Sequence, residues 1–215
     1  MSHLCVLGCL TTEEGKRIKA EMLEWLNKDY EVLCIDQEPP GKLFEYPAIK
    51  CALKLAIDMN QPVLYIHTKG AGNPIPSYAN NKRMMNPRFN VPKTAKPEDC
   101  QKVIRDMWKY EFTGERLKTY IDEVNVEKPT VCCPYTGPEK FTWWNAWIIN
   151  PSAAKIILNK LKQTDYRWYY ERIFNNENSI DVKGLRMNNL KCATLDSNKE
   201  FWDDIWQFYE ENNVR

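Results

Sequence analysis

The sequence predicts an α/β fold in which a mostly parallel sheet is flanked by helices within a single domain, residues 1–215. Apolar runs of strand length alternate with segments whose apolar residues recur at helical spacing. The first strand, helix and strand follow one another closely, which is the order of a βαβ unit and favours parallel pairing. The length of 215 residues is that of one complete hydrophobic core.

Three strands and two helices are predicted in the first third of the chain. The strands are expected over residues 4–10, 30–36 and 63–66. The first helix should begin at a capping box formed by Thr11 and Glu14, because Thr followed three residues later by Glu is a helix-start pattern. The second helix is expected over residues 47–58, where apolar residues again recur at helical spacing.

The rest of the chain combines helical patterns, a short strand and loops. Residues 70–96 show little periodicity and predict a long loop. Helical patterns follow on both sides of a break near Gly114, and a short strand is expected over residues 130–134. The pair Asn150-Pro151 is a helix-start pattern, and a last helix is expected around residues 201–209.

Composition and charge argue against several classes of function. Lys plus Arg (30) nearly balance Asp plus Glu (29), so the chain lacks the basic excess of proteins that bind nucleic acid. No apolar run reaches the roughly 18 residues of a transmembrane segment, and residues 1–10 lack the basic start of a signal peptide. The eight cysteines form no CxxC pair and fall mostly in apolar patterns. We therefore expect a cytoplasmic protein without zinc, without a nucleic-acid partner and without a transmembrane segment.

The segment that follows the third predicted strand carries the most chemical information. Its apolar run ends in His67, Thr68 and Lys69, and Gly70 and Gly72 follow. Side chains at the carboxyl ends of parallel strands face the crevice in which α/β proteins bind ligands. An imidazole, a hydroxyl, an ammonium group and glycine N–H groups are suited to holding a diphosphate. The alternatives are a packed core histidine and a solvated lysine.

This strand end is one of three segments that together form a larger pattern. The pattern Tyr-x-His-[Ser/Thr]-Lys-Gly at residues 65–70 is preceded by Glu45-Tyr46-Pro47 at the start of a predicted helix, and a Trp-Trp pair lies within residues 141–145. In these features the chain resembles a group of small glycosyltransferase-like proteins. The order of its elements is similar to the amino-terminal part of the GT-A fold, a Rossmann-related α/β sheet on which many nucleotide-sugar transferases are built.

The resemblance implies an enzyme: a cytoplasmic glycosyltransferase that moves a sugar from a nucleotide-sugar donor to a saccharide acceptor, in the biosynthesis of a surface polysaccharide. The residues expected to bind the donor are Asp36, His67, Thr68, Lys69 and Gly70. In related enzymes a D-x-D segment holds a divalent cation, and here the His-Thr-Lys segment occupies that position. We therefore expect catalysis without a metal cofactor, with manganese or magnesium as the alternative.

The acceptor side is expected to use aromatic and carboxylate side chains. Trp143 and Trp144 would stack on the apolar face of a sugar ring. Alternatively these tryptophans fill the core, since Trp143 and Trp147 would fall on one face of a helix. A reaction that inverts the anomeric carbon needs a carboxylate that takes the proton of the acceptor hydroxyl, whereas a retaining reaction needs none. The candidates for this base are Asp106, Glu139 and Glu171, and the alternative for each is a surface charge or a partner in a helix ion pair.

Two other functions fit parts of the sequence. A non-catalytic module on the same fold, binding a nucleotide or a carbohydrate, would explain the lack of a D-x-D segment. A phosphate-ester hydrolase is disfavoured, because the sequence holds no nucleophile motif and no cluster of metal-binding carboxylates. Nucleotide binding followed by a donor-hydrolysis assay separates an enzyme from a binding module.

Overall fold

The computed structural model describes residues 2–38, 45–68, 84–164, 167–175, 177–188, 190 and 199–213. Their strands are β1 (His3–Leu10), β2 (Tyr30–Gln37), β3 (Val63–His67), β4 (Thr130–Tyr135), β5 (Trp147–Ile149) and β6 (Asp181–Met187). Their α-helices are α1 (Glu13–Asp29), α2 (Tyr46–Met59), α4 (Asp99–Glu111), α5 (Gly114–Val124), α6 (Pro151–Lys160) and α7 (Lys199–Asn213). Short 3-10 helices are η1 (Pro138–Lys140), η2 (Trp143–Asn145) and η3 (Arg167–Arg172). The predicted α/β class is confirmed.

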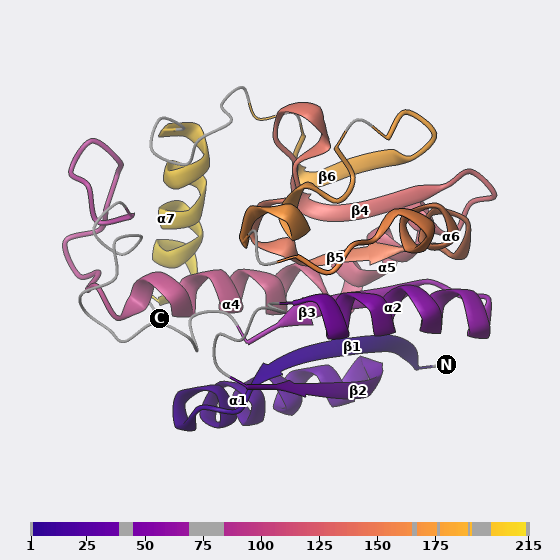
Figure 1. Ribbon diagram of the computed structural model, residues 1–215. Helices are drawn as coiled ribbons and strands as arrows, with labels where there is room; N and C mark the ends of the chain where they lie inside the picture. The colour runs from indigo at the N-terminus through magenta and orange to yellow at the C-terminus, as the bar shows by residue number, and fades with distance from the viewer. Residues whose placement is uncertain are drawn as a thin grey trace.

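The strands lie in the order β2-β1-β3-β5-β4-β6 across a six-stranded sheet of the described residues, with helices on both faces (Figure 1). β1 pairs in parallel with β2 and β3, and β4 pairs in parallel with β6. β5 is antiparallel to both of its neighbours, β3 and β4. The sheet is therefore mixed but mostly parallel. The order of the strands reverses at β1, which has β2 on one side and β3 on the other.

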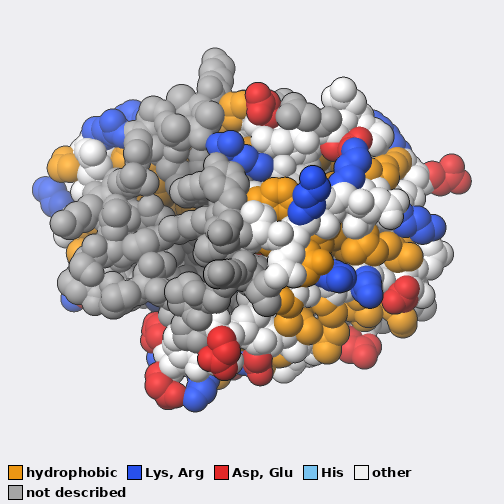
Figure 2. Space-filling view, in the orientation of Figure 1, with side chains coloured by type: hydrophobic (Ala, Val, Ile, Leu, Met, Phe, Trp, Pro, Cys, Tyr) orange, Lys and Arg blue, Asp and Glu red, His pale blue; other side chains and the backbone are white. Residues whose placement is uncertain are grey.

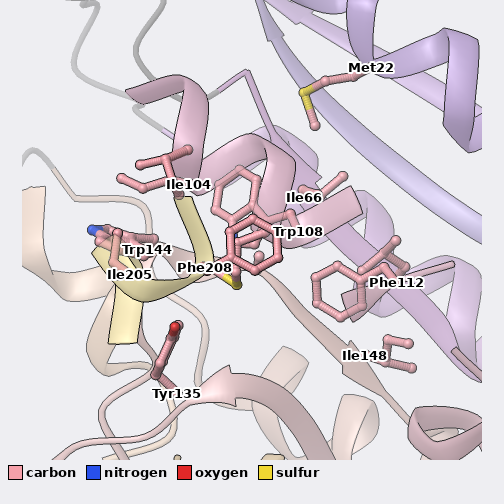
Figure 3. Packing of buried hydrophobic residues seen from close by; sticks show 14 of the residues in the cluster. Met22, Ile66, Ile104, Trp108, Phe112, Tyr135, Trp144, Ile148, Ile205 and Phe208 are labelled. Carbon is pink, nitrogen blue, oxygen red and sulfur yellow. The ribbon is translucent and has the colours of Figure 1, made fainter. Parts of the chain in front are cut away.

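Two apolar layers hold the helices on the sheet. One layer packs α1, α4, α5 and α7 on one face, and Figure 3 labels side chains of this layer from α1, α4, α7 and the strands. The other layer packs α2 and α6 on the opposite face. Over the described part of the face in Figure 2, basic side chains lie among acidic and apolar ones. No helix within the described ranges is both long and apolar enough to cross a membrane.

The start of α1 differs by one residue from the predicted capping box. Thr12 is the N-cap residue, and its hydroxyl oxygen accepts the Gly15 N–H at 2.9 Å. Thr11 instead donates its N–H to the carbonyl of Gln37 at 3.0 Å, so it still belongs to the edge of the sheet. The predicted cap at Asn150 is confirmed, because its side-chain oxygen accepts the Ala153 N–H at 3.0 Å.

The prediction that Trp143 and Trp147 share one face of a helix is wrong. Trp147 begins β5, the antiparallel strand, and pairs with Tyr65 of β3. Trp144 and Asn145 have φ angles of 58° and 52°, which end the 3-10 turn, because a right-handed helix cannot continue through the left-handed region. The aromatic segment is therefore a turn that leads into a strand.

Because several cysteine thiols are buried, the free energy of unfolding should fall at alkaline pH. Burial raises the pKa of Cys9, Cys100 and Cys132 from an ordinary 9.0 to about 12 in each case. A folded-state pKa above the unfolded one contributes stability that is complete below about pH 9 and is lost as the pH rises through about 12. We expect the urea midpoint under reducing conditions to stay level from pH 7 to 8.5 and to fall above pH 9.

A Cys132→Ala variant isolates the contribution of one thiol. Its stability should fall less steeply above pH 9, by up to roughly 1.4 kcal/mol per pH unit, which is the value of one proton. If the free energy of unfolding fell with pH equally steeply in the wild type and in this variant, Cys132 would have the same pKa in the folded and unfolded chain.

Candidate functional site

The candidate site lies at the carboxyl ends of β1 and β3, where the order of the strands reverses. In open α/β sheets such a reversal leaves a crevice that binds ligands. The Thr68 N–H donates to the carbonyl of Gly8 at 2.9 Å, and the Thr68 hydroxyl oxygen accepts the Leu10 N–H at 3.1 Å. Thr68 is only 4% exposed. Its side chain therefore joins the two strand ends, and its predicted contact with a donor stays a prediction.

His67 is the last residue of β3 and is largely enclosed by aromatic rings. Its ring meets that of Trp108 edge-on, with centroids 5.4 Å apart, and lies 6.3 Å from the ring of Tyr65. Its Nε2 atom is 3.9 Å from Oε1 of Glu45, and the His67 side chain is 16% exposed. His67 therefore combines packed surroundings with a carboxylate neighbour and some access to solvent.

Glu45 directly precedes α2 and brings a carboxylate to the end of β3. Its Oε2 atom accepts a hydrogen bond from the Tyr65 hydroxyl at 3.1 Å and another from the Asn145 side-chain N–H. Burial, followed by the Glu45 carboxylate, raises the pKa of Tyr65 well above its ordinary value, so the phenol remains a donor. Glu45 was not among the residues predicted to bind or react, although Glu45-Tyr46-Pro47 was part of the recognised pattern.

Asn145 is fully buried, and the turn before β5 positions it. Its side-chain oxygen accepts the Trp147 indole N–H at 2.8 Å, so its amide N–H group is directed to Glu45. Residues held at positive φ are costly for side chains other than glycine and often occur at functional sites. Glu45, Tyr65, His67, Asn145 and Trp147 together are called the Glu45 cluster below.

The indole of Trp108 adds a polar group next to this cluster. Trp108 is fully buried on α4 beside His67, and its Nε1 atom has no hydrogen-bond acceptor within the described part of the chain. A buried N–H without an acceptor is uncommon and calls for an explanation such as a bound water or ligand. Trp108 was not among the residues predicted to bind or react.

The other predicted donor-binding residues are separated from the Glu45 cluster or are not described. Asp36 lies near the end of β2, is exposed, and forms an ion pair with Lys19 at 2.8 Å. Its position at the end of the second predicted strand is as expected, and its role stays a prediction. Lys69 and Gly70 lie outside the described residues.

Of the two predicted acceptor-binding tryptophans, the structure describes the side chain of Trp144. It is 3% exposed and packs against the rings of Tyr135, Phe201 and Trp202 in the apolar layer. Figure 3 labels Trp144 in this layer, beside Ile205 of α7. This packing agrees with the alternative that the tryptophans fill the core. The side chain of Trp143 lies outside the described residues.

The three candidate carboxylates lie in different surroundings. Asp106 pairs with Lys102 on α4 and lines a groove of about 260 Å³ beside α1. Glu139 is exposed in η1 at a φ of 56°. Glu171 lies in η3, and its backbone carbonyl accepts the N–H of Thr142 at 3.1 Å, just before η2. Of the three, Glu171 is therefore tied to the segment that carries Asn145.

Within the described ranges, no three His, Cys, Asp or Glu side chains lie close enough together to hold a metal ion. Around the end of β3 the site contains one carboxylate, one imidazole, one amide, one phenol, one hydroxyl and two indoles. Comparison of the chain with known protein families, with curated proteins and with solved structures found no match.

Proposed function

We propose that the chain is a GT-A-like glycosyltransferase that moves a sugar from a nucleotide-sugar donor to a saccharide acceptor in cytoplasmic biosynthesis of a surface polysaccharide. The observation that carries this proposal is the Glu45 cluster at the end of β3, beside the point where the strand order reverses. Ligands of α/β sheets bind at such a point. The donor-binding pattern in the sequence begins at the same strand end.

In this proposal the anomeric bond to the diphosphate breaks and its electron pair leaves with the diphosphate. His67, Lys69 and the backbone N–H of Gly70 stabilise that negative charge in place of a metal ion. The acceptor hydroxyl forms the new bond to the anomeric carbon. If the reaction inverts, its proton passes to a carboxylate, for which Glu171 is favoured because η3 contacts the segment before η2.

A binding module without catalysis is the second candidate, and two observations favour it. The Thr68 oxygen already accepts a backbone hydrogen bond, and Trp144 is buried in the apolar layer. Thr68 and Trp144, two of the residues predicted to bind a ligand, therefore contact protein atoms instead. Such a module would bind a nucleotide or a carbohydrate without turning it over.

Thermal shift measurements with UDP, GDP, CDP and TDP test the donor site. One nucleotide should raise the melting temperature more than the others, because a ligand at a hundred times its Kd stabilises the folded state by about 2.7 kcal/mol. In a chain of this size that is a shift of several degrees, at about 2–4 °C per kcal/mol. Inorganic pyrophosphate is the control. No rise, or an equal rise with pyrophosphate alone, would contradict a nucleotide-specific site.

Donor hydrolysis and transfer assays with the matching nucleotide sugars then separate the enzyme from the module. Full activity should survive exhaustive chelation, because His67 and Lys69 replace the cation in this proposal. Strict dependence on manganese or magnesium would contradict metal-independent catalysis. Binding without turnover would favour the module.

A further inference from the structure

The outward sides of α2 and α6 form a basic surface with apolar side chains, called the α2–α6 face below. The two helices pack against each other on the face of the sheet opposite α1, α4, α5 and α7. We propose that the α2–α6 face docks the protein on a membrane surface that contains anionic lipids. This inference goes beyond the proposed function and does not depend on it.

The charges of the α2–α6 face are nearly all positive. α2, α6 and the two residues that follow α6 contain five lysines and one carboxylate, that of Asp58. Lys54, Lys155 and Lys162 are exposed. Lys160 forms an ion pair with a carboxylate outside the two helices. The face therefore presents several ammonium groups to solvent with little negative charge among them.

The helices on the opposite face of the sheet carry no such excess of positive charge. α7 holds one lysine and five carboxylates, and α5 holds two basic residues and three carboxylates. The chain as a whole is nearly neutral, with 30 basic and 29 acidic residues. Among these helices the positive charge is therefore concentrated on one side, which would orient the molecule in the field of an anionic surface.

Apolar side chains on the same side of the sheet are also open to solvent. Met59 at the end of α2 is 55% exposed, and Leu33 of β2 is 44% exposed. Leu33 pairs with Val6, which belongs to the layer beneath α2, so its side chain points to the same side. Glu31, which pairs with Leu4 of that layer, adds a second carboxylate. Figure 2 shows Lys and Arg side chains among apolar ones where Figure 1 places α2 and α6.

Lysines among apolar side chains fit a lipid surface better than a protein partner. Interfaces between proteins are depleted in lysine, because ordering this long side chain costs entropy. At a bilayer the lysine stem lies along apolar groups while its ammonium group stays at the level of the head groups. The cytoplasmic leaflet of cell membranes carries anionic lipids that attract basic segments. A bilayer therefore complements both the charge and the apolar side chains of the α2–α6 face.

Cosedimentation with large unilamellar vesicles tests this inference. The wild type should bind vesicles made of phosphatidylcholine and phosphatidylglycerol, and it should not bind vesicles of phosphatidylcholine alone. The bound fraction should fall as sodium chloride is raised from about 0.05 to about 0.5 M, because salt screens the attraction between the lysines and the lipids.

Replacing Lys54, Lys155 and Lys162 together with glutamine should weaken binding to the anionic vesicles by roughly a hundredfold, because each lysine near such a surface contributes about fivefold. Met59→Ser should weaken the same binding by a smaller factor, since its exposed side chain would enter the apolar part of the interface.

The matched control replaces Lys16, Lys109 and Lys118 with glutamine. These lysines are exposed on α1, α4 and α5, so the control removes the same charge from the opposite face of the sheet. Its binding to the anionic vesicles should stay close to that of the wild type, because the lipid charge is screened across the width of the protein. Melting temperatures of both triple variants should match the wild type, since all six side chains are exposed.

The inference is overturned if the wild type does not bind the anionic vesicles, if it binds the neutral vesicles equally well, or if the two triple variants bind alike. Light scattering examines a second copy of the chain as the occupant. A wild-type dimer that the Lys54, Lys155 and Lys162 variant dissociates would assign the face to self-association and would also overturn the inference. Nucleotide-induced stabilisation is measured without vesicles, so its result decides the proposed function separately.

Discussion

Replacing Arg186 with methionine should lower the free energy of unfolding by roughly 3–5 kcal/mol, the cost of breaking a buried ion pair by removing one partner. Arg186 binds Asp204 through two hydrogen bonds of 2.6 and 2.9 Å, and it binds Glu111 through a third of 3.1 Å. The Glu111 side chain is fully buried. The variant therefore leaves two enclosed carboxylates with fewer cations around them.

Lys183→Met is the matched control, because Lys183 lies on the same strand and loses the same charge. Its ion pair with Glu123 is partly exposed on both sides. Such pairs contribute only about 0–1 kcal/mol, so the control should stay close to the wild type. Urea denaturation measures both variants. If both variants lost a similarly small free energy of unfolding, the ion pairs of Arg186 would contribute no more than the exposed pair of Lys183.

The ion pairs of Arg186 with Asp204 and Glu111 also support the candidate site indirectly, through α7. Asp204 lies on α7, which also carries Phe201 and Trp202. Those two rings pack against Trp144, the residue directly before Asn145. Loosening α7 should therefore weaken nucleotide-induced stabilisation as well as the stability of the fold, although Arg186 touches no member of the Glu45 cluster in the described contacts.

Replacing Gly15 with alanine should destabilise the fold by roughly 3 kcal/mol or more, because the added carbon meets backbone that cannot move cheaply. A Cβ atom at Gly15 would lie 2.0 Å from the Leu10 carbonyl oxygen and 2.8 Å from its carbon. The first turn of α1 would have to shift away from the end of β1. That end is one side of the candidate crevice, so nucleotide-induced stabilisation should fall too.

Gly114→Ala separates this steric clash from simple backbone strain. Gly114 has a φ of +56°, and nothing lies within 4 Å of an added Cβ. Alanine there should cost only about 1–2 kcal/mol, the price of a left-handed residue. Melting temperatures of the two variants provide the comparison. If Gly15→Ala lowered the melting temperature no more than Gly114→Ala, the close approach of α1 to β1 would be contradicted.

Local patterns in the sequence located most helices and the first four strands. Apolar spacing predicted α2 as residues 47–58, where the structure has Tyr46–Met59. The cap at Asn150 was correct, and the cap at Thr11 was one residue early because Thr11 pairs with the edge of β2. Helix caps depend on neighbours in the sequence, except where a strand elsewhere competes for the same N–H.

The missed strands have physical reasons that the sequence does not reveal. β5 is three residues long and follows two left-handed residues, so it has too little length for a strand pattern. β6 lies at the edge of the sheet and is only partly buried along its length, so polar residues interrupt its apolar pattern. Both strands exist because β4 offers a backbone edge on each side.

The sequence by itself determined the α/β class, the βαβ opening and the strand end at which chemistry is expected, because those depend on short-range periodicity and on residue types that end strands. Only the tertiary structure decided which side chains share that place. Asn145 reaches Glu45 across 100 residues of chain, and Thr68 reaches Leu10 across 58. Such contacts arise from how the sheet brings distant segments together, which no local pattern encodes.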